Sequence, residues 1–396
     1  MSEQRTRVHE IAWLEVFPWL RLADCLRMSL RFGALLLGTF GFLAMLAGWQ
    51  LIARFFASSE NPATEALIRQ LTIWPGEAKL APDASLLPML SAILDFPVRI
   101  LAPIQTLFNP AVSLGTWFFA LLCGLWALLV WSLFGAALTR MAALSLTVGV
   151  KVGPLTALRY GMQRWTAYFG GPVLPLLSGV FFAAILFLPS LITRLDFGAA
   201  IVGILWPLLL GVGLILSLVL LGLLFGWPLM WPVISVEGTE PFDAISRAYS
   251  YTYHRFLRYL FFAGVALLLG SVGLLIVNLF VESTISLAEW SLSWGAGRER
   301  LGELANPATA TNRTMLGFAA WSIQGWNWLV RLVMGGFMAS YFWTSSTLIY
   351  LLLRQAEDGA EIEEIYIEDQ GNEFGLPPLT TDAAGVPAVG DQPPTP

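Results

Sequence analysis

Long apolar runs alternate with shorter polar connections along the chain. Six of them reach or approach the roughly 18 residues that a helix needs to cross the hydrocarbon core of a bilayer. They cover residues 34–53, 112–138, 172–192, 199–233, 260–281 and 327–353. Lipid offers no partner for backbone N–H and C=O groups, and the runs lack the alternating pattern of barrel strands, so each run predicts a helix. The expected fold class is all-α, a polytopic transmembrane helix bundle.

The fourth run, residues 199–233, is longer than one ordinary span. Its expected helix breaks are Pro207, Pro228 and Pro232, because proline removes a backbone hydrogen bond from a helix. We therefore expect a span at about 208–230 that follows an irregular turn. A short re-entrant hairpin is the alternative.

The first outer connection contains a second apolar stretch, residues 86–108. Three prolines (Pro88, Pro97 and Pro103) interrupt it, and so do Asp95 and Arg99. This spacing predicts short helices along the outer membrane interface and no single spanning helix.

Orientation follows from the basic residues in the connections. Most of them fall on the side that holds the N-terminus, which predicts that both termini are cytoplasmic. The first sustained apolar run begins near residue 33, too late for a cleavable signal, so the first span is expected to drive insertion.

We expect a transmembrane domain over residues 1–354. Residues 355–396 form an acidic tail that contains proline and glycine and is expected to be largely disordered.

A segment that begins with proline precedes each odd-numbered span, at Pro18, Pro154 and Pro241. After Pro241, the apolar residues recur at spacings of three and four, which predicts an amphipathic helix on the cytoplasmic surface. The pattern indicates three copies of an interfacial helix followed by a helical hairpin. The polar residues expected at this surface are Asp243, Arg247, Arg255, Arg258, Arg159 and Arg164.

These interfacial helices have two interpretations. Their basic and aromatic residues are typical of segments that sense anionic lipid. Their charge is small compared with polybasic lipid-binding clusters, which favours the simpler role of orienting the spans. Asp243 and Arg247 stand four residues apart, so we expect them to pair and to support their helix.

Polar residues within or beside the spans are the candidate site residues. Arg331 and Glu282 lie near the outer ends of their spans, where they are expected to pair or to reach the interface. Asn278, Tyr341, Thr344 and Ser345 lie deeper, and such groups more often join helices than line a substrate path.

Small residues at four-residue spacing mark close approach between helices. Gly222 with Gly226, and Gly336 with Ser340, have this spacing. We expect helix packing at both places.

Composition agrees with the membrane class and excludes several others. The chain has 396 residues, of which 57% are hydrophobic and only 12% charged, and its mean hydropathy is +0.69. The 22 basic residues include only two lysines, and the pI of about 5.2 also argues against a nucleic-acid partner. Two cysteines and two histidines without ligand spacing predict neither a disulfide scaffold nor a metal site.

No catalytic motif occurs in the sequence, so we expect no catalytic residue, no cofactor and no enzymatic activity. A membrane-embedded enzyme whose residues are scattered along the chain stays open as an alternative. The tail carries acids without any Lys or Arg, and an apolar cluster (Ile362, Ile365, Tyr366 and Ile367) lies within it. This cluster could bind a protein partner. Packing against the protein's own basic helices is favoured because their charge is opposite.

Three stretches carry a resemblance. They are the segment from Trp227 to Tyr251, the Phe-Pro-Trp-Leu-Arg at Phe17, and the segment from Tyr341 to Arg354. The chain up to about residue 369 resembles an uncharacterised family of bacterial multi-pass membrane proteins, which implies the fold, the bacterial inner membrane and about six spans. The Glu-Gly-x-x-Pro-x-x-Ala-Ile element also looks like the membrane domain found beside some glycerophosphodiester phosphodiesterases. Their catalytic domain has no counterpart here, which removes that activity.

Two functional hypotheses follow. In the first, the protein is non-catalytic, contacts membrane lipid, and serves membrane organisation or docks a protein partner through its acidic tail. In the second, it is a transporter or channel for a small or lipid-like solute that uses the break near Pro207 and the polar residues of the last span. The sequence leaves the oligomeric state open.

Overall fold

The computed structural model describes residues 16–56, 61–72, 86–305, 314–366, 380–381 and 387–388. Most of the acidic tail beyond Tyr366, including Ile367, lies outside these ranges. Two short strands within it, β1 (Thr380–Thr381) and β2 (Pro387–Ala388), pair antiparallel. Residues 355–366 of the tail are described and continue the last long helix to Asp358. Apart from the two strands, the rest of the tail expected to be disordered lies outside the described residues.

Apart from short connecting loops, the rest of the described chain is helical, which confirms the all-α fold class. The helices are η1 (Pro18–Ala23), α2 (Asp24–Ser29), α3 (Phe32–Phe56), α4 (Pro62–Thr72), α5 (Leu86–Leu107), α6 (Leu114–Thr147), α7 (Pro154–Gln163), α8 (Trp165–Ile192), α9 (Asp196–Glu237), α10 (Pro241–His254), α11 (Phe256–Ala296), α12 (Arg298–Ala305) and α13 (Thr314–Asp358).

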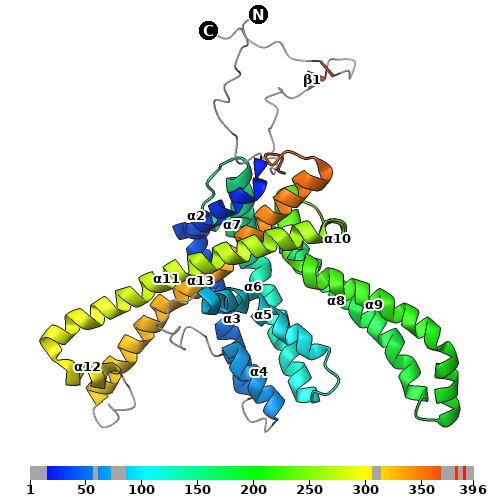
Figure 1. Ribbon diagram of the computed structural model, residues 1–396, viewed down its shortest axis with the longest axis horizontal. Helices are drawn as coiled ribbons and strands as arrows, with labels where there is room; N and C mark the ends of the chain where they lie inside the picture. Colours follow the sequence, from blue (N-terminus) through cyan, green and yellow to red (C-terminus); the bar gives the residue numbers. More distant parts are fainter. Residues whose placement is uncertain are drawn as a thin grey trace, which may run out of the picture.

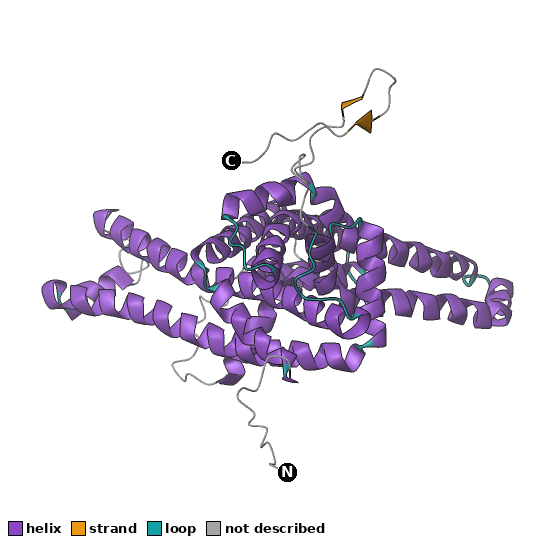
Figure 2. Ribbon diagram, turned by 90° about the horizontal axis from the view of Figure 1, so that it is seen from above, coloured by secondary structure: helices purple, strands orange, loops and turns teal. Residues whose placement is uncertain are grey.

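Long helices pair into three arms: α3 with α6, α8 with α9, and α11 with α13. The arms converge at one end, where the short helices α2, α7 and α10 lie, and diverge at the other (Figure 1). We call the first of these the hub end. Seen from above, two arms extend to opposite sides of a central cluster (Figure 2). Each short helical segment starts at a proline, and each precedes one arm. The repeated unit expected from the sequence is therefore present in the fold.

Six helices in the described part of the chain are long and apolar enough to cross a membrane: α3, α5 from Pro88, α6, α8, α9 and α11. Five of these match expected spans, but α5 does not. It is one helix with Pro97 and Pro103 inside it, so the expectation of separate short helices is wrong. Its two charges are paired, because Arg99 Nε lies 2.5 Å from Asp95 Oδ2.

The expected sixth span, residues 327–353, lies inside α13 but is not among the six apolar helices. Several hydroxyl-bearing residues lower its mean hydropathy, and these residues are buried against the other arms (Ser340, Thr344, Ser345, Ser346 and Thr347). Helix α13 is thus the central helix of the bundle: it pairs with α11 in its own arm and packs against α3, α6 and α9 of the other two arms.

The expected helix break at Pro207 is absent. Helix α9 continues for 42 residues, with Pro207, Pro228 and Pro232 inside it. A proline removes one hydrogen bond, but an apolar segment in lipid has no other partner for the remaining backbone groups, so the helix persists around it. At 1.5 Å per residue the helix is about 63 Å long, roughly twice the thickness of the hydrocarbon core.

Aromatic side chains fill the centre where the arms meet. Trp231 of α9 stacks on Trp343 of α13 with ring centroids 4.2 Å apart. Phe96 of α5 meets Trp131 of α6 edge-on at 4.8 Å. This aromatic cluster joins the three arms into one core.

Both pairs of small residues lie at close contacts between helices, as predicted. One pair contacts a short surface helix and not another span. Gly222 and Gly226 lie against the ring of Tyr249 in α10, a surface helix and not another span. Gly336 lies against Thr39 of α3, and Ser340 Oγ is 3.3 Å from the carbonyl oxygen of Ser29.

Candidate functional site

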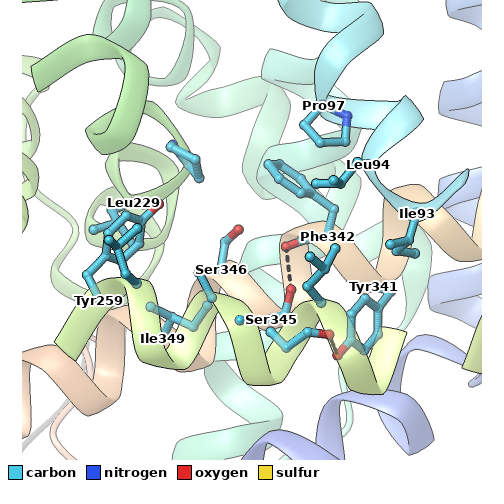
Figure 3. Close-up of a pocket in the computed structure, with 16 residues that line it drawn as sticks. Ile93, Leu94, Pro97, Leu229, Tyr259, Tyr341, Phe342, Ser345, Ser346 and Ile349 are labelled. Atoms are coloured by element: carbon cyan, nitrogen blue, oxygen red, sulfur yellow. Dashed lines mark hydrogen bonds between the residues drawn. The ribbon is translucent and has the colours of Figure 1, made fainter. Parts of the chain in front are cut away.

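A cavity of about 420 Å³ lies between α5, α9, α11 and α13, so α5 and helices from two of the three arms line it. Figure 3 shows the side chains that surround it. Most of its wall is apolar, including Pro97 of α5 and Leu229 of α9. Leu94 and Leu260 in the wall are 42% and 41% exposed, so the cavity opens to the surface of the helices.

Two of the sequence-predicted residues line this cavity, and both have hydrogen bonds within the protein. Tyr341 donates to the carbonyl oxygen of Ala266 in α11 at 2.7 Å and thereby links two helices. Ser345 donates to the carbonyl oxygen of Phe342 at 3.0 Å. Both hydroxyls keep their oxygen lone pairs as acceptors.

Two further hydroxyls lie in the wall: Ser346 belongs to the polar run of the last expected span, whereas Tyr259 was not predicted as a site residue. Ser346 is 5% exposed and Tyr259 is 8% exposed, and neither hydroxyl has a hydrogen bond to another described residue. In Figure 3 both residues stand beside the open space. Both hydroxyls are therefore available to bond a ligand in the cavity that carries an oxygen or nitrogen atom.

Prolines change the backbone around the same cavity. Pro97 and Pro232 lack the amide that an α-helix uses to bond the carbonyl four residues earlier. Those carbonyls belong to Ile93 and Pro228, and both residues line the cavity. The cavity thus combines apolar walls with a few polar groups, the usual composition of a small-molecule site.

Other predicted residues lie elsewhere. Thr344 lines a smaller recess on the other side of α13. Asn278 is buried, and its Oδ1 has no hydrogen-bond partner in the described part of the chain, so the expected helix-joining bond through this atom is not formed. Arg331 and Glu282 pair through two hydrogen bonds of 2.8 and 3.1 Å. This confirms the expected ion pair.

A polar cap closes the hub end. It consists of Arg140, Arg164, Glu237, Arg354 and Tyr366. Helix α9 ends here at Gly238, whose φ of 65° is left-handed. The amide of Tyr366 donates to the carbonyl oxygen of Val236 at 2.7 Å. The segment after α13 is therefore bound to the end of α9, and Ile362 beside it is only 4% exposed. The apolar cluster of the tail, as far as it is described, packs against the protein itself.

Glu237 is the central acid of the polar cap. Its carboxylate accepts hydrogen bonds from Tyr350 and, at 2.9 Å, from Arg247. Arg354 Nε lies 3.6 Å away. Arg247 therefore pairs with Glu237 and not with Asp243, so the expected Asp243–Arg247 pair is wrong. The reason is that α10 packs against the end of α9, which brings a more buried carboxylate within reach.

The buried face of α10 also differs from the predicted apolar stripe. Ala244 and Ala248 are fully buried against the protein, whereas Phe242 is 70% exposed and Tyr253 is 45% exposed. Small residues allow α10 to lie close to α9. The large apolar residues predicted to share one face remain partly free to contact lipid.

The remaining predicted surface residues lie at the hub end. Arg159 and Arg258 are exposed, and Arg164 donates to the carbonyl oxygen of Gly238 at 2.6 Å. Arg255 bonds to Glu357 of α13. Nearby, burial and the hydrogen bond to Asp358 raise the pKa of Tyr251, which therefore remains a neutral donor at physiological pH.

Among the described residues, no three His, Cys, Asp or Glu side chains come together as metal ligands would. Comparisons with family models, with curated proteins and with solved structures find no match for this chain.

Proposed function

We propose that the protein is a non-catalytic, multi-pass protein of the bacterial inner membrane that organises the bilayer by holding membrane lipid between its arms. The single observation that carries this proposal is the apolar cavity between α5, α9, α11 and α13, where two of the three arms meet. Its wall contains free hydroxyls, and it opens between helices that are long and apolar enough to span a membrane. An acyl chain with its ester oxygens has the chemistry that this wall would bind.

The outer parts of the arms support the same proposal. In the most hydrophobic window of α9 only 11% of residues are buried, and in that of α8 only 22%. Such surfaces are solvated by lipid and not by protein. Arms that diverge from one hub therefore enclose lipid between them. A protein partner for the acidic tail stays a prediction.

Filling the cavity tests the proposal. Gly264 lines the cavity, and a side chain added there meets no atom within 4 Å. We expect Gly264→Phe to fold normally and to reduce the lipid retained after detergent purification by one molecule per chain. Quantitative mass spectrometry of the bound lipid measures this.

Gly211→Phe is the matched control, because Gly211 lies on the exposed arm of α9 and is equally unobstructed. It should retain the wild-type amount of lipid. Equal lipid content in wild type, Gly264→Phe and Gly211→Phe would contradict the proposal.

Transport of a lipid-like solute is the second candidate. The two free hydroxyls of Ser346 and Tyr259 favour it, because they could accompany a polar headgroup through the bundle. Proteoliposomes distinguish the two candidates. Flux of a labelled lipid that depends on Ser346 indicates transport, whereas bound lipid without flux indicates a structural role.

Orientation gives a further prediction. We place the hub end in the cytoplasm, together with both described ends of the chain. Leu155 of α7 is 80% exposed at the hub end, and Leu195 at the turn between α8 and α9 is 69% exposed. Both native cysteines are buried, so labelling background is low. Leu155→Cys should react with an impermeant thiol reagent only from the cytoplasmic side, and Leu195→Cys only from the opposite side. Labelling of both from one side would exclude a membrane crossing by α8.

A further inference from the structure

A second recess, of about 160 Å³, lies at the hub end on the side of α13 away from the large cavity. It is formed by the start of α3, the last turns of α6 and the residues that lead into α7. Its charged lining residues are Arg31 and Lys151, and Ser145 and Thr344 supply hydroxyl groups. No carboxylate lines it.

Within the described ranges, neither cation in this recess is paired with a carboxylate. None of the ion pairs among the described residues includes Arg31 or Lys151. Arg31 Nη1 donates to Ser145 Oγ at 2.5 Å, which holds one edge of the guanidinium and leaves the other N–H groups available. Two unneutralised cations around one small space attract an anion. The fork of an arginine and the point charge of a lysine are typical phosphate ligands.

The surroundings of the recess fit a lipid as the source of that phosphate. Apolar side chains next to it in the chain are strongly exposed: Phe32 is 79% exposed, Val150 52% and Leu155 80%. The recess has room for a phosphate group but not for acyl chains. These exposed side chains would contact the chains outside it, as at other interfacial lipid sites.

We propose that this recess binds the phosphate group of an anionic membrane phospholipid, with Arg31, Lys151 and Ser145 as its ligands. This site goes beyond the proposed function, because it lies apart from the large cavity and recognises a headgroup. Filling the large cavity through Gly264 therefore does not affect it, and the two proposals can fail independently.

The test is a titration of the purified full-length chain with phosphatidylglycerol, followed by native mass spectrometry. Lys151 is exposed, so K151Q keeps the fold. We expect K151Q to weaken the apparent Kd about fivefold and the double variant R31Q/K151Q roughly thirtyfold. The matched control is R27Q/R159Q, which removes the same charge from exposed positions of α2 and α7 outside the recess. It should bind as the wild type does.

Two results would overturn the proposal. Equal weakening by R27Q/R159Q would mean that general surface charge, and not the recess, attracts the lipid. Binding of inorganic phosphate as tight as that of phosphatidylglycerol would assign the recess to free phosphate instead of lipid. The melting temperatures of K151Q and R31Q/K151Q should equal that of the wild type, which shows that any weaker binding does not come from unfolding.

Discussion

Replacing Gly336 by alanine will force α13 away from α3 and destabilise the protein by about 2–3 kcal/mol. A Cβ at this position would lie 2.0 Å from Thr39 Oγ1 and 2.7 Å from the backbone nitrogen of Thr39. Rotation of the Thr39 side chain can relieve the first contact, but only movement of a helix can relieve the second. The same contact is tight from the other side, because a Cβ on Gly38 would lie 2.3 Å from the carbonyl oxygen of Gly336.

Gly325→Ala is the internal control for this prediction. Gly325 belongs to the same helix and has no atom within 4 Å of an added Cβ. Alanine has the higher helix propensity, so this variant should be neutral or slightly stabilising. Thermal unfolding in detergent should show a melting temperature several degrees lower for Gly336→Ala alone. Equal melting temperatures of the two variants would mean that the close approach of α3 and α13 is not present in the protein.

The Gly336 and Ser340 pair shows what sequence spacing can establish. Four-residue spacing of small residues correctly identified a close helix contact, because only small side chains allow backbones to meet. It could not identify the partner, since many helices in a bundle could supply the other surface. For Gly222 and Gly226 that surface is Tyr249 of α10, a residue predicted to lie on the membrane.

Proline was a less reliable guide than apolar length. The apolar runs placed the long helices because exclusion of water requires internal hydrogen bonding of the backbone. The breaks expected at Pro207 and around Pro97 did not occur, although proline disfavours a helix in water. One carbonyl left without its donor costs more in lipid than in water, but a broken helix in lipid would leave several such groups unsatisfied.

The residues of the large cavity could not be found from sequence. Tyr341, Ser345 and Ser346 stood out as polar groups in an apolar run, but Tyr259 reaches the same cavity only because α11 packs against α13. Asp95 and Arg99 carried a readable signal, because opposite charges four residues apart in an apolar stretch can neutralise each other in one helix. That pairing is what permits α5 to be long and continuous.

At the hub end, the role of Arg140 could not be predicted from the sequence either, and its replacement is the second substitution expected to have a large effect on stability. Arg140 follows the expected span at residues 112–138, so by the expected orientation it belongs to a cytoplasmic connection. Helix α6 instead continues to Thr147, and Arg140 is only 5% exposed. Its Nη1 donates to the carbonyl oxygens of Ser235 at 2.7 Å and Tyr366 at 3.0 Å. The negative end of the α9 dipole thus provides the counter-charge that no carboxylate supplies within the described chain.

Arg140→Met should therefore destabilise the protein by about 3–5 kcal/mol, because each hydrogen bond from a charged donor contributes about 1.5–3 kcal/mol and the buried carbonyls lose their donor. The loss also releases the segment that ends at Tyr366, so a Glu-specific protease should cut the chain at Glu361, Glu363 or Glu364 faster than in the wild type. Arg159→Met removes an exposed arginine of α7 and should change neither measurement. Arg140→Lys keeps the charge but not the planar fork, and it should fall between the two. If Arg140→Met melts and is cleaved as the wild type is, the bond between the tail segment and the end of α9 contributes nothing to the stability of the polar cap.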